Sequence, residues 1–114
     1  MKKFIALALC AIMTLTMFTG CGAKGKTLEE VKEAGKLVIA TSPDFPPFEN
    51  LEGGEVVGIE IDIMNIICEK LGVELVIEQM NFDAVLPGIQ AKKFDVGVSG
   101  ITVTPDREKT TLFS

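Results

Sequence analysis

The sequence predicts an α/β fold with a parallel sheet, because strand-like and helical segments alternate after residue 27. Residues 37–40 form a continuous apolar run, which is typical of a strand covered on both faces. Residues 59–71 carry apolar side chains at three-to-four spacing, which indicates an amphipathic helix. Residues 73–79 alternate between apolar and polar side chains, which indicates a second strand.

The folded part is expected to begin with a short helix. Thr27 and Glu30 have the spacing of a capping box, and Gly35 is expected to end the helix. The strand 37–40 follows. The segment 42–50, rich in Pro and Phe, is then expected to be a loop, and residues 55–58 a brief extended piece.

The long helix is expected to turn one apolar face to the core and to end at Gly72. That face is assigned Ile59, Ile63, Ile66, Ile67 and Leu71, with Glu60, Asp62, Glu69 and Lys70 largely on the other side.

After the second strand, residues 81–92 are expected to form one or two short helical turns, the second starting at Pro87. A third strand is predicted over 94–98. Thr104 has the character of a helix cap, with Pro105 at the first helical position.

The first 21 residues have the layout of an export signal. Lys2 and Lys3 precede an apolar run over 4–18, and Gly20 comes directly before Cys21. The junction resembles the lipobox of bacterial lipoproteins, which implies cleavage before Cys21 and lipid on that cysteine. A membrane anchor and an ordinary secretory signal are the alternatives, although the run is shorter than the roughly 20 residues of a spanning helix. The expected organisation is a signal peptide (1–20), a lipidated cysteine and tether (21–26) and a folded part (27–114), held at the extracytoplasmic face of the membrane.

Composition excludes several classes of function. Cleavage would remove two lysines and move the formal charge from −5 to −7, and so acidic a chain is a poor partner for nucleic acid. The chain has no histidine, which excludes His-based metal sites and Ser-His or Cys-His catalysis within it. Cys68 has no cysteine partner once Cys10 and Cys21 are set aside and is expected to be a buried thiol. No metal, cofactor or enzymatic activity is predicted.

Several motifs stand in the order found in one family. They are 37–41 (LVIAT), 43–49 (PDFPPFE), 58–63 (GIEIDI), 91–96 (AKKFDV) and 100–107 (GITVTPDR) followed by 113–114 (FS). Together they resemble the extracytoplasmic amino-acid-binding proteins of ABC importers, the bacterial extracellular solute-binding proteins of family 3. The resemblance implies a fold like that of type II periplasmic binding proteins, with only the N-terminal part of lobe 1 present. The hinge, the second lobe and the return segment would be missing, so the chain is expected to be a fragment with half a cleft and impaired binding.

The same resemblance implies extracytoplasmic capture of a polar amino acid for an ABC permease and its ATPase subunit. A ligand-sensing domain of a receptor and a dehydratase-like enzyme on the same fold are the alternatives. The residues do not indicate which amino acid is bound, or which acid of the second lobe would hold its ammonium group.

Arg107 is the predicted anchor of the ligand carboxylate. It is the only arginine of the chain, and a planar guanidinium binds a carboxylate through two parallel hydrogen bonds. Thr102 can offer its hydroxyl and its backbone N–H to the same carboxylate. The alternative for Arg107 is a solvated surface cation, and the alternative for Thr102 is a hydroxyl bonded to backbone.

The remaining predicted contacts come from the resemblance. It implies that the hydroxyl of Ser99 and the backbone of Gly100, where many relatives carry serine, lie close to the ligand. Phe45 and Phe82 would flank the ligand side chain, where two rings can also hold a cation. For Ser99 and Gly100 the alternative is a tight turn, and for Phe45 and Phe82 it is ordinary core packing. Phe48 is expected to pack inward.

Overall fold

A computed structural model describes residues 25–114, so the predicted signal peptide and Cys21 lie outside the described residues. No helix within this range is long and apolar enough to cross a membrane. The elements are α2 (Leu28–Ala34), β1 (Lys36–Thr41), β2 (Asp44–Phe45), β3 (Glu49–Glu52), β4 (Glu55–Val57), α3 (Ile59–Leu71), β5 (Glu74–Gln79), α4 (Phe82–Gln90), β6 (Val96–Gly97) and α5 (Pro105–Glu108).

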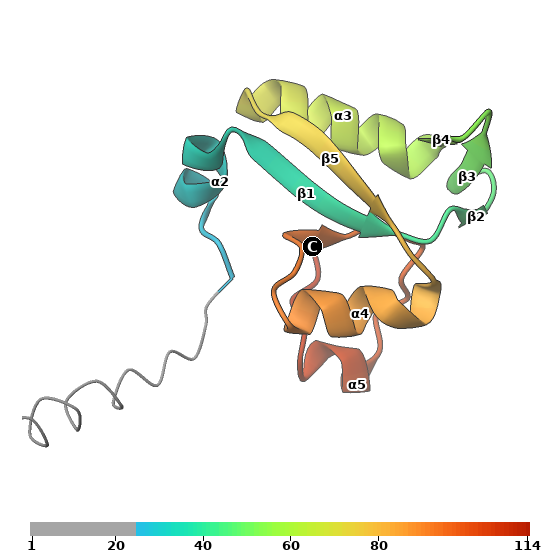
Figure 1. The fold of residues 1–114 in the computed structure, drawn as a ribbon. Coiled ribbons are helices and arrows are strands. Elements are labelled where there is room, and N and C mark those ends of the chain that lie inside the picture. Colours follow the sequence, from blue (N-terminus) through green and yellow to red (C-terminus); the bar gives the residue numbers. More distant parts are fainter. Residues whose placement is uncertain (1–24) are drawn as a thin grey trace, which may run out of the picture.

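The main sheet is parallel and has the order β5-β1-β6. β1 pairs with β5 along its whole length, from Lys36 opposite Glu74 to Thr41 opposite Gln79. Figure 1 shows α3 and α4 on opposite sides of this sheet. The buried core lies between the sheet and its helices, and Ile39 at the centre of β1 has no exposed surface. The predicted α/β class is confirmed.

The helix ends follow their local signals. Thr27 and Glu30 form the capping box: the Thr27 hydroxyl accepts the Glu30 N–H at 3.2 Å, and the Glu30 carboxylate accepts the Thr27 N–H at 2.7 Å. Gly35 and Gly72 end α2 and α3 in the left-handed conformation that glycine adopts without strain. Thr104 caps α5 through its hydroxyl. These predictions are confirmed.

The core face assigned to α3 was wrong. The buried residues are Ile61, Met64 and Cys68, which face the sheet, and burial raises the pKa of the Cys68 thiol. The four isoleucines assigned to the core are instead at least 39% exposed: Ile59, Ile63, Ile66 and Ile67. The reason is that α3 carries apolar side chains on two sides, so a three-to-four period fits either of them.

α4 is one continuous helix with Pro87 inside it, rather than two short pieces. Pro87 lacks the N–H that would bond four residues back, which costs the helix one hydrogen bond. Tertiary packing offsets this loss: Val85 and Gly88 are buried, and a Cβ at Gly88 would lie 2.5 Å from the Phe94 ring.

β6 is shorter than predicted, with only Val96 and Gly97 in regular pairing. The chain nevertheless follows β1 on both sides of that pair. The Asp95 N–H donates to the Val38 oxygen at 2.9 Å, and the Asp95 carboxylate accepts the Val38 N–H at 2.9 Å. Because the side chain of Asp95 takes one of the backbone donors, the ladder is interrupted there. β6 forms an edge of the sheet.

The expected loop over 42–50 contains strands. β2, β3 and β4 form a small antiparallel sheet at the end of β1. This sheet is fixed to the start of α3, because the Glu60 N–H donates to the Phe48 oxygen at 3.1 Å. Gly58 permits the approach: its φ is +138°, and a Cβ there would lie 2.2 Å from that oxygen. This small sheet is therefore held beside the carboxyl end of β1.

Candidate functional site

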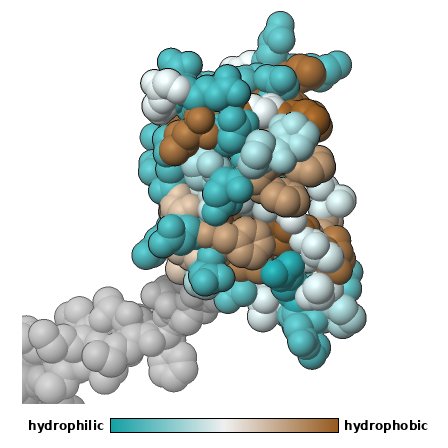
Figure 2. All heavy atoms as spheres, turned by 90° about the vertical axis from the view of Figure 1, so that its right-hand side faces the viewer, coloured by the Kyte–Doolittle hydropathy of each residue, from teal (hydrophilic) through white to brown (hydrophobic). Residues whose placement is uncertain are grey.

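The predicted ligand residues gather where the parallel strands end. Phe45 lies on β2, Phe82 begins α4, and Ser99 to Arg107 follow β6. In open α/β sheets this edge is the usual place for a ligand. Figure 2 looks onto this end of the molecule and shows apolar side chains across its middle, with hydrophilic side chains around them.

Arg107 is held by two neighbours and keeps most of its donors. Its Nη1 donates to the Thr102 carbonyl oxygen at 2.7 Å, and its Cζ lies 5.7 Å from the centre of the Phe82 ring. A guanidinium has five N–H donors, so one bond to Thr102 leaves the others for an anion. The structure thus brings Phe82, Thr102 and Arg107 together as one cluster with a fixed cation.

Phe45 and Gly100 form a second cluster. The Phe45 ring is 53% exposed, and it stacks on Phe48 with 5.3 Å between ring centres. A Cβ at Gly100 would lie 3.1 Å from the Phe45 ring, so glycine lets the ring lie against the turn. The inward packing expected of Phe48 was wrong, since that ring is 40% exposed. It stacks on Phe45 at the surface instead.

Ser99 is turned inward. Its hydroxyl accepts the Ser42 N–H at 3.0 Å and lies 3.2 Å from Oε1 of Glu49. Ser99 as a whole is 4% exposed. Because these partners use its hydrogen-bonding capacity, the geometry gives the hydroxyl a positioning role, and the direct ligand contact expected of it stays a prediction.

Two carboxyl groups behind the turn were missed from the sequence. Glu49 has no exposed surface, although it belongs to a segment predicted as loop. Glu60 was assigned to the outer face of its helix, yet both of its oxygens accept the Gly100 N–H, at 3.1 and 3.2 Å. Burial, and next the carboxyl of Glu60 beside it, raise the pKa of Glu49 from 4.5 to about 7. Both residues lie within motifs of the resemblance, 43–49 and 58–63, but their surroundings come from distant parts of the chain, so residue type did not reveal their role.

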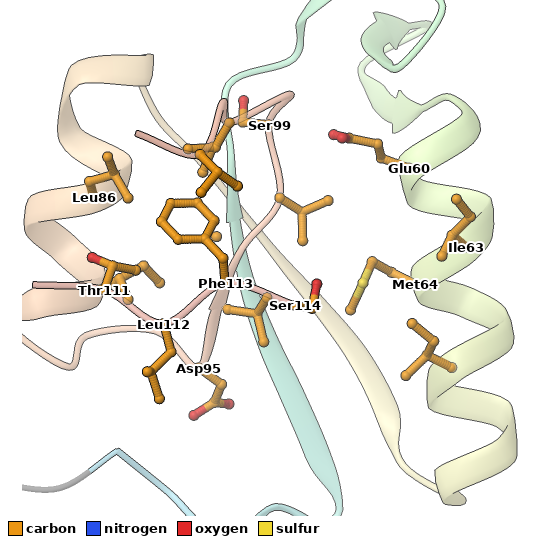
Figure 3. Close-up of a pocket in the computed structure, with 17 residues that line it drawn as sticks. Glu60, Ile63, Met64, Leu86, Asp95, Ser99, Thr111, Leu112, Phe113 and Ser114 are labelled. Carbon is orange, nitrogen blue, oxygen red and sulfur yellow. The ribbon is translucent and has the colours of Figure 1, made fainter. Parts of the chain in front are cut away.

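A groove beside β6 is a separate feature. It has a volume of about 600 Å³ and runs along the open edge of β6 between α3 and α4. Figure 3 shows Ile63 and Met64 on one side of it and Leu86 on the other, with Phe113 between them. Of the six predicted ligand residues only Ser99 lines this groove. Phe45, Gly100 and Thr102 are exposed, so the predicted ligand site is an open surface, whereas the groove is an uncovered sheet edge.

The open surface combines a cation that can bind a carboxylate with aromatic rings beside it. Arg107 supplies the cation, and the rings of Phe45 and Phe82 supply apolar faces that also attract positive groups. Among residues 25–114 no group of three or more Cys, Asp or Glu side chains is arranged to hold a metal ion. The ligand roles of these residues stay predictions.

Comparison with known proteins identifies relatives that align with the whole length of this chain. Residues 37–114 match the sequence model of the bacterial extracellular solute-binding proteins, family 3. The "Arginine-binding extracellular protein ArtP" of Bacillus subtilis (strain 168) is 34% identical over 114 residues, which is all of this chain and 44% of the relative. The "ABC transporter arginine-binding protein 1" of Escherichia coli (strain K12) is 30% identical over 115 residues, covering all of this chain and 42% of the relative. The chain therefore spans less than half the length of these curated relatives.

A solved structure agrees. The arginine-bound form of domain 1 from TmArgBP, a protein of T. maritima, is 44% identical and aligns with a TM-score of 0.68. The alignment covers 70% of this chain and 64% of that one. The fold is that of a type II periplasmic amino-acid-binding domain, of which this chain forms part of one lobe, as the sequence predicted.

Proposed function

The chain belongs to the bacterial extracellular solute-binding proteins, family 3, and we propose that it binds an amino acid outside the cytoplasm for delivery to an ABC permease and its ATPase subunit. The observation that carries the proposal is the Arg107 guanidinium, anchored at 2.7 Å on the Thr102 carbonyl and resting over Phe82. In this role Arg107 and Thr102 bind the α-carboxylate, and Phe45 and Phe82 flank the side chain. Gly100 gives the Phe45 ring its room.

A cationic amino acid such as arginine fits the surface best. Asp44 is exposed on β2 directly before Phe45, and Glu60 lies behind the neighbouring turn, so a negative potential adjoins the aromatic faces. The relatives reported above are named for arginine, and one of them is an arginine-bound single domain. This last relative supports binding by one lobe without the second, and this chain aligns with 64% of it. The relatives' names favour a binding protein over the dehydratase-like alternative.

Calorimetry on the full chain tests the carboxylate anchor. The chain has no Trp and no Tyr, so intrinsic fluorescence reports little. L-arginine should bind, and agmatine, which lacks the carboxylate, should bind far more weakly. Arg107→Ala should weaken L-arginine binding by roughly tenfold to a hundredfold, because a hydrogen bond to a charged group contributes about 1.5–3 kcal/mol. Arg107→Lys should recover only part of the loss, since it keeps the charge without the planar fork.

Lys109→Ala is the matched control. It removes one positive charge two residues away, where Lys109 pairs with the exposed Asp106 at 2.6 Å. Affinity should stay within about twofold of wild type, as for most exposed ion pairs. Equal binding of agmatine and L-arginine, or an Arg107→Ala variant with unchanged affinity, would remove the carboxylate anchor from the proposal.

Membrane attachment through Cys21 is the second part of the proposal. Its support is the charged start, the apolar run and Gly20 before the cysteine. Under this reading residues 1–20 are removed, 21–26 form the lipidated tether, and 27–114 form the partial lobe. Cells fed an alkyne analogue of palmitate should label wild type but not Cys21→Ser. Equal labelling of both proteins would contradict lipidation at this residue.

A further inference from the structure

Glu49 is a buried acid without a basic partner. It has no exposed surface, and the two ion pairs among residues 25–114 join Lys26 to Asp95 and Lys109 to Asp106. An ionised carboxyl in such a place loses its hydration without gaining a counter-charge, which is costly. The protein must therefore compensate for Glu49 in another way.

Its neighbours make ionisation harder. The carboxyl of Glu60 from α3 raises the pKa of Glu49, and the negative charge of Asp44 from β2 acts in the same direction. The hydroxyl of Ser99, which lies 3.2 Å from Oε1, favours the ionised form. The other oxygen, Oε2, is buried and has no hydrogen-bond partner. Two ionised carboxylates can only accept hydrogen bonds, so one added proton gives the pair the donor that it otherwise lacks.

The two carboxyl groups hold consecutive residues of the turn after β6. Glu49 contacts the hydroxyl of Ser99, and Glu60 accepts the N–H of Gly100 with both oxygens. Figure 3 shows the Glu60 carboxyl directed from the start of α3 toward the segment that carries Ser99. Thr102 follows two residues later, and its carbonyl anchors Arg107. The turn therefore links the carboxyl pair to the predicted carboxylate anchor.

We propose that Glu49 and Glu60 share one proton, and that this carboxyl pair positions the turn at Ser99 and Gly100 from which Thr102 and Arg107 reach the ligand. Glu49 and Glu60 are positioning residues here, since neither is assigned a contact with ligand. The link to ligand binding rests on the proposed function, whereas the shared proton and its hold on the turn do not.

Loss of the proton releases the turn. With both groups ionised, the buried Glu49 repels Glu60, which is partly exposed and can move into water. Glu60 then ceases to hold the Gly100 N–H. Because burial and the acidic neighbours raise the pKa of Glu49 to about 7, the release falls between pH 6 and 8.

Nuclear magnetic resonance on the full chain tests the pair without any ligand. Carbon-13 spectra of the glutamate carboxyls should show Glu49 titrating near pH 7, and the Gly100 amide signal should shift with the same midpoint. Glu49→Gln should abolish the shift of the Gly100 amide, and Glu60→Gln should move the Glu49 midpoint toward 4.5. Glu33→Gln, an exposed substitution on α2, should change neither. A Glu49 carboxyl that titrates near 4.5, or a Gly100 amide that ignores the Glu49 titration, would overturn the inference.

Calorimetry with L-arginine at pH 5.5 and pH 8.5 supplies the second arm. Affinity of wild type should fall by up to about thirtyfold at pH 8.5, where about 3% of the pair keeps its proton. In Glu49→Gln the dependence on pH should disappear. The same pH dependence in wild type and Glu49→Gln would overturn the inference. Absence of L-arginine binding at every pH, with the titration as expected, would refute the proposed function and leave the carboxyl pair supported.

Discussion

The buried Glu49 predicts that the chain loses stability as pH rises. Its pKa is 4.5 in an unfolded chain and about 7 in the fold. Between these values the folded state binds more protons than the unfolded state, so the free energy of unfolding decreases with rising pH. The stabilisation is fully present below 4.5 and is lost as pH rises through 7. At about 1.36 kcal/mol per pH unit the whole loss is about 3 kcal/mol, of which about 2.5 kcal/mol falls between pH 5 and pH 8.

Urea unfolding followed by circular dichroism measures this loss. Other carboxyl groups also respond to pH, so the informative quantity is the difference between wild type and Glu49→Gln. That difference should change by about 2.5 kcal/mol between pH 5 and pH 8, in the direction that favours wild type at low pH. Glu33→Gln, which removes an exposed carboxyl on α2, should follow wild type at both pH values. If wild type and Glu49→Gln kept a constant difference across this range, the raised pKa would be wrong.

Three further predictions concern stability and association. Gly58→Ala should lower the free energy of unfolding by at least about 2 kcal/mol, because the added methyl group would lie 2.2 Å from a backbone oxygen. Gly54→Ala, which has open space around it, should lower the free energy of unfolding by less in the same urea experiment. Thr27→Ala should cost about 1 kcal/mol through loss of the cap on α2, and an unchanged urea midpoint would contradict that role. The chain should self-associate through its exposed apolar side chains, and replacing Ile63 and Ile67 by lysine should reduce the oligomers seen in sedimentation velocity; equal association of both proteins would contradict this.

Local chemistry explains what the sequence could predict of the fold. The cap at Thr27 and the glycine ends of α2 and α3 depend on residues within one turn of each other, and all are present in the structure. The centre of β1, residues 37–40, was predictable from a continuous apolar run, because both faces of this part of the strand are covered. The hairpin of β3 and β4 also had a local signal, the pair Gly53 and Gly54 between two extended segments.

Long-range packing decided the rest. α3 has apolar side chains on two sides, and only the position of the sheet selects Ile61, Met64 and Cys68 for burial. The length of β6 depends on Asp95, whose carboxylate bonds to a strand residue 57 positions earlier. Glu49 likewise reaches a hydroxyl 50 positions away. A pattern within a window of ten residues contains none of this information.

The candidate site divides in the same way between what a motif reveals and what packing creates. Arg107 and Phe45 are accessible, and their chemistry can be inferred from residue type and order alone. Glu49 and Ser99 are buried, and their contribution exists only once β3 is folded against the turn that follows β6. Buried charged groups in proteins are usually paired with an opposite charge, and a buried acid beside a second acid is an exception to this rule. Such exceptions concentrate at functional sites. Glu49 bonds to Ser99 and Glu60 to Gly100, at the edge where the predicted ligand residues converge, which favours a role in binding over an accident of packing.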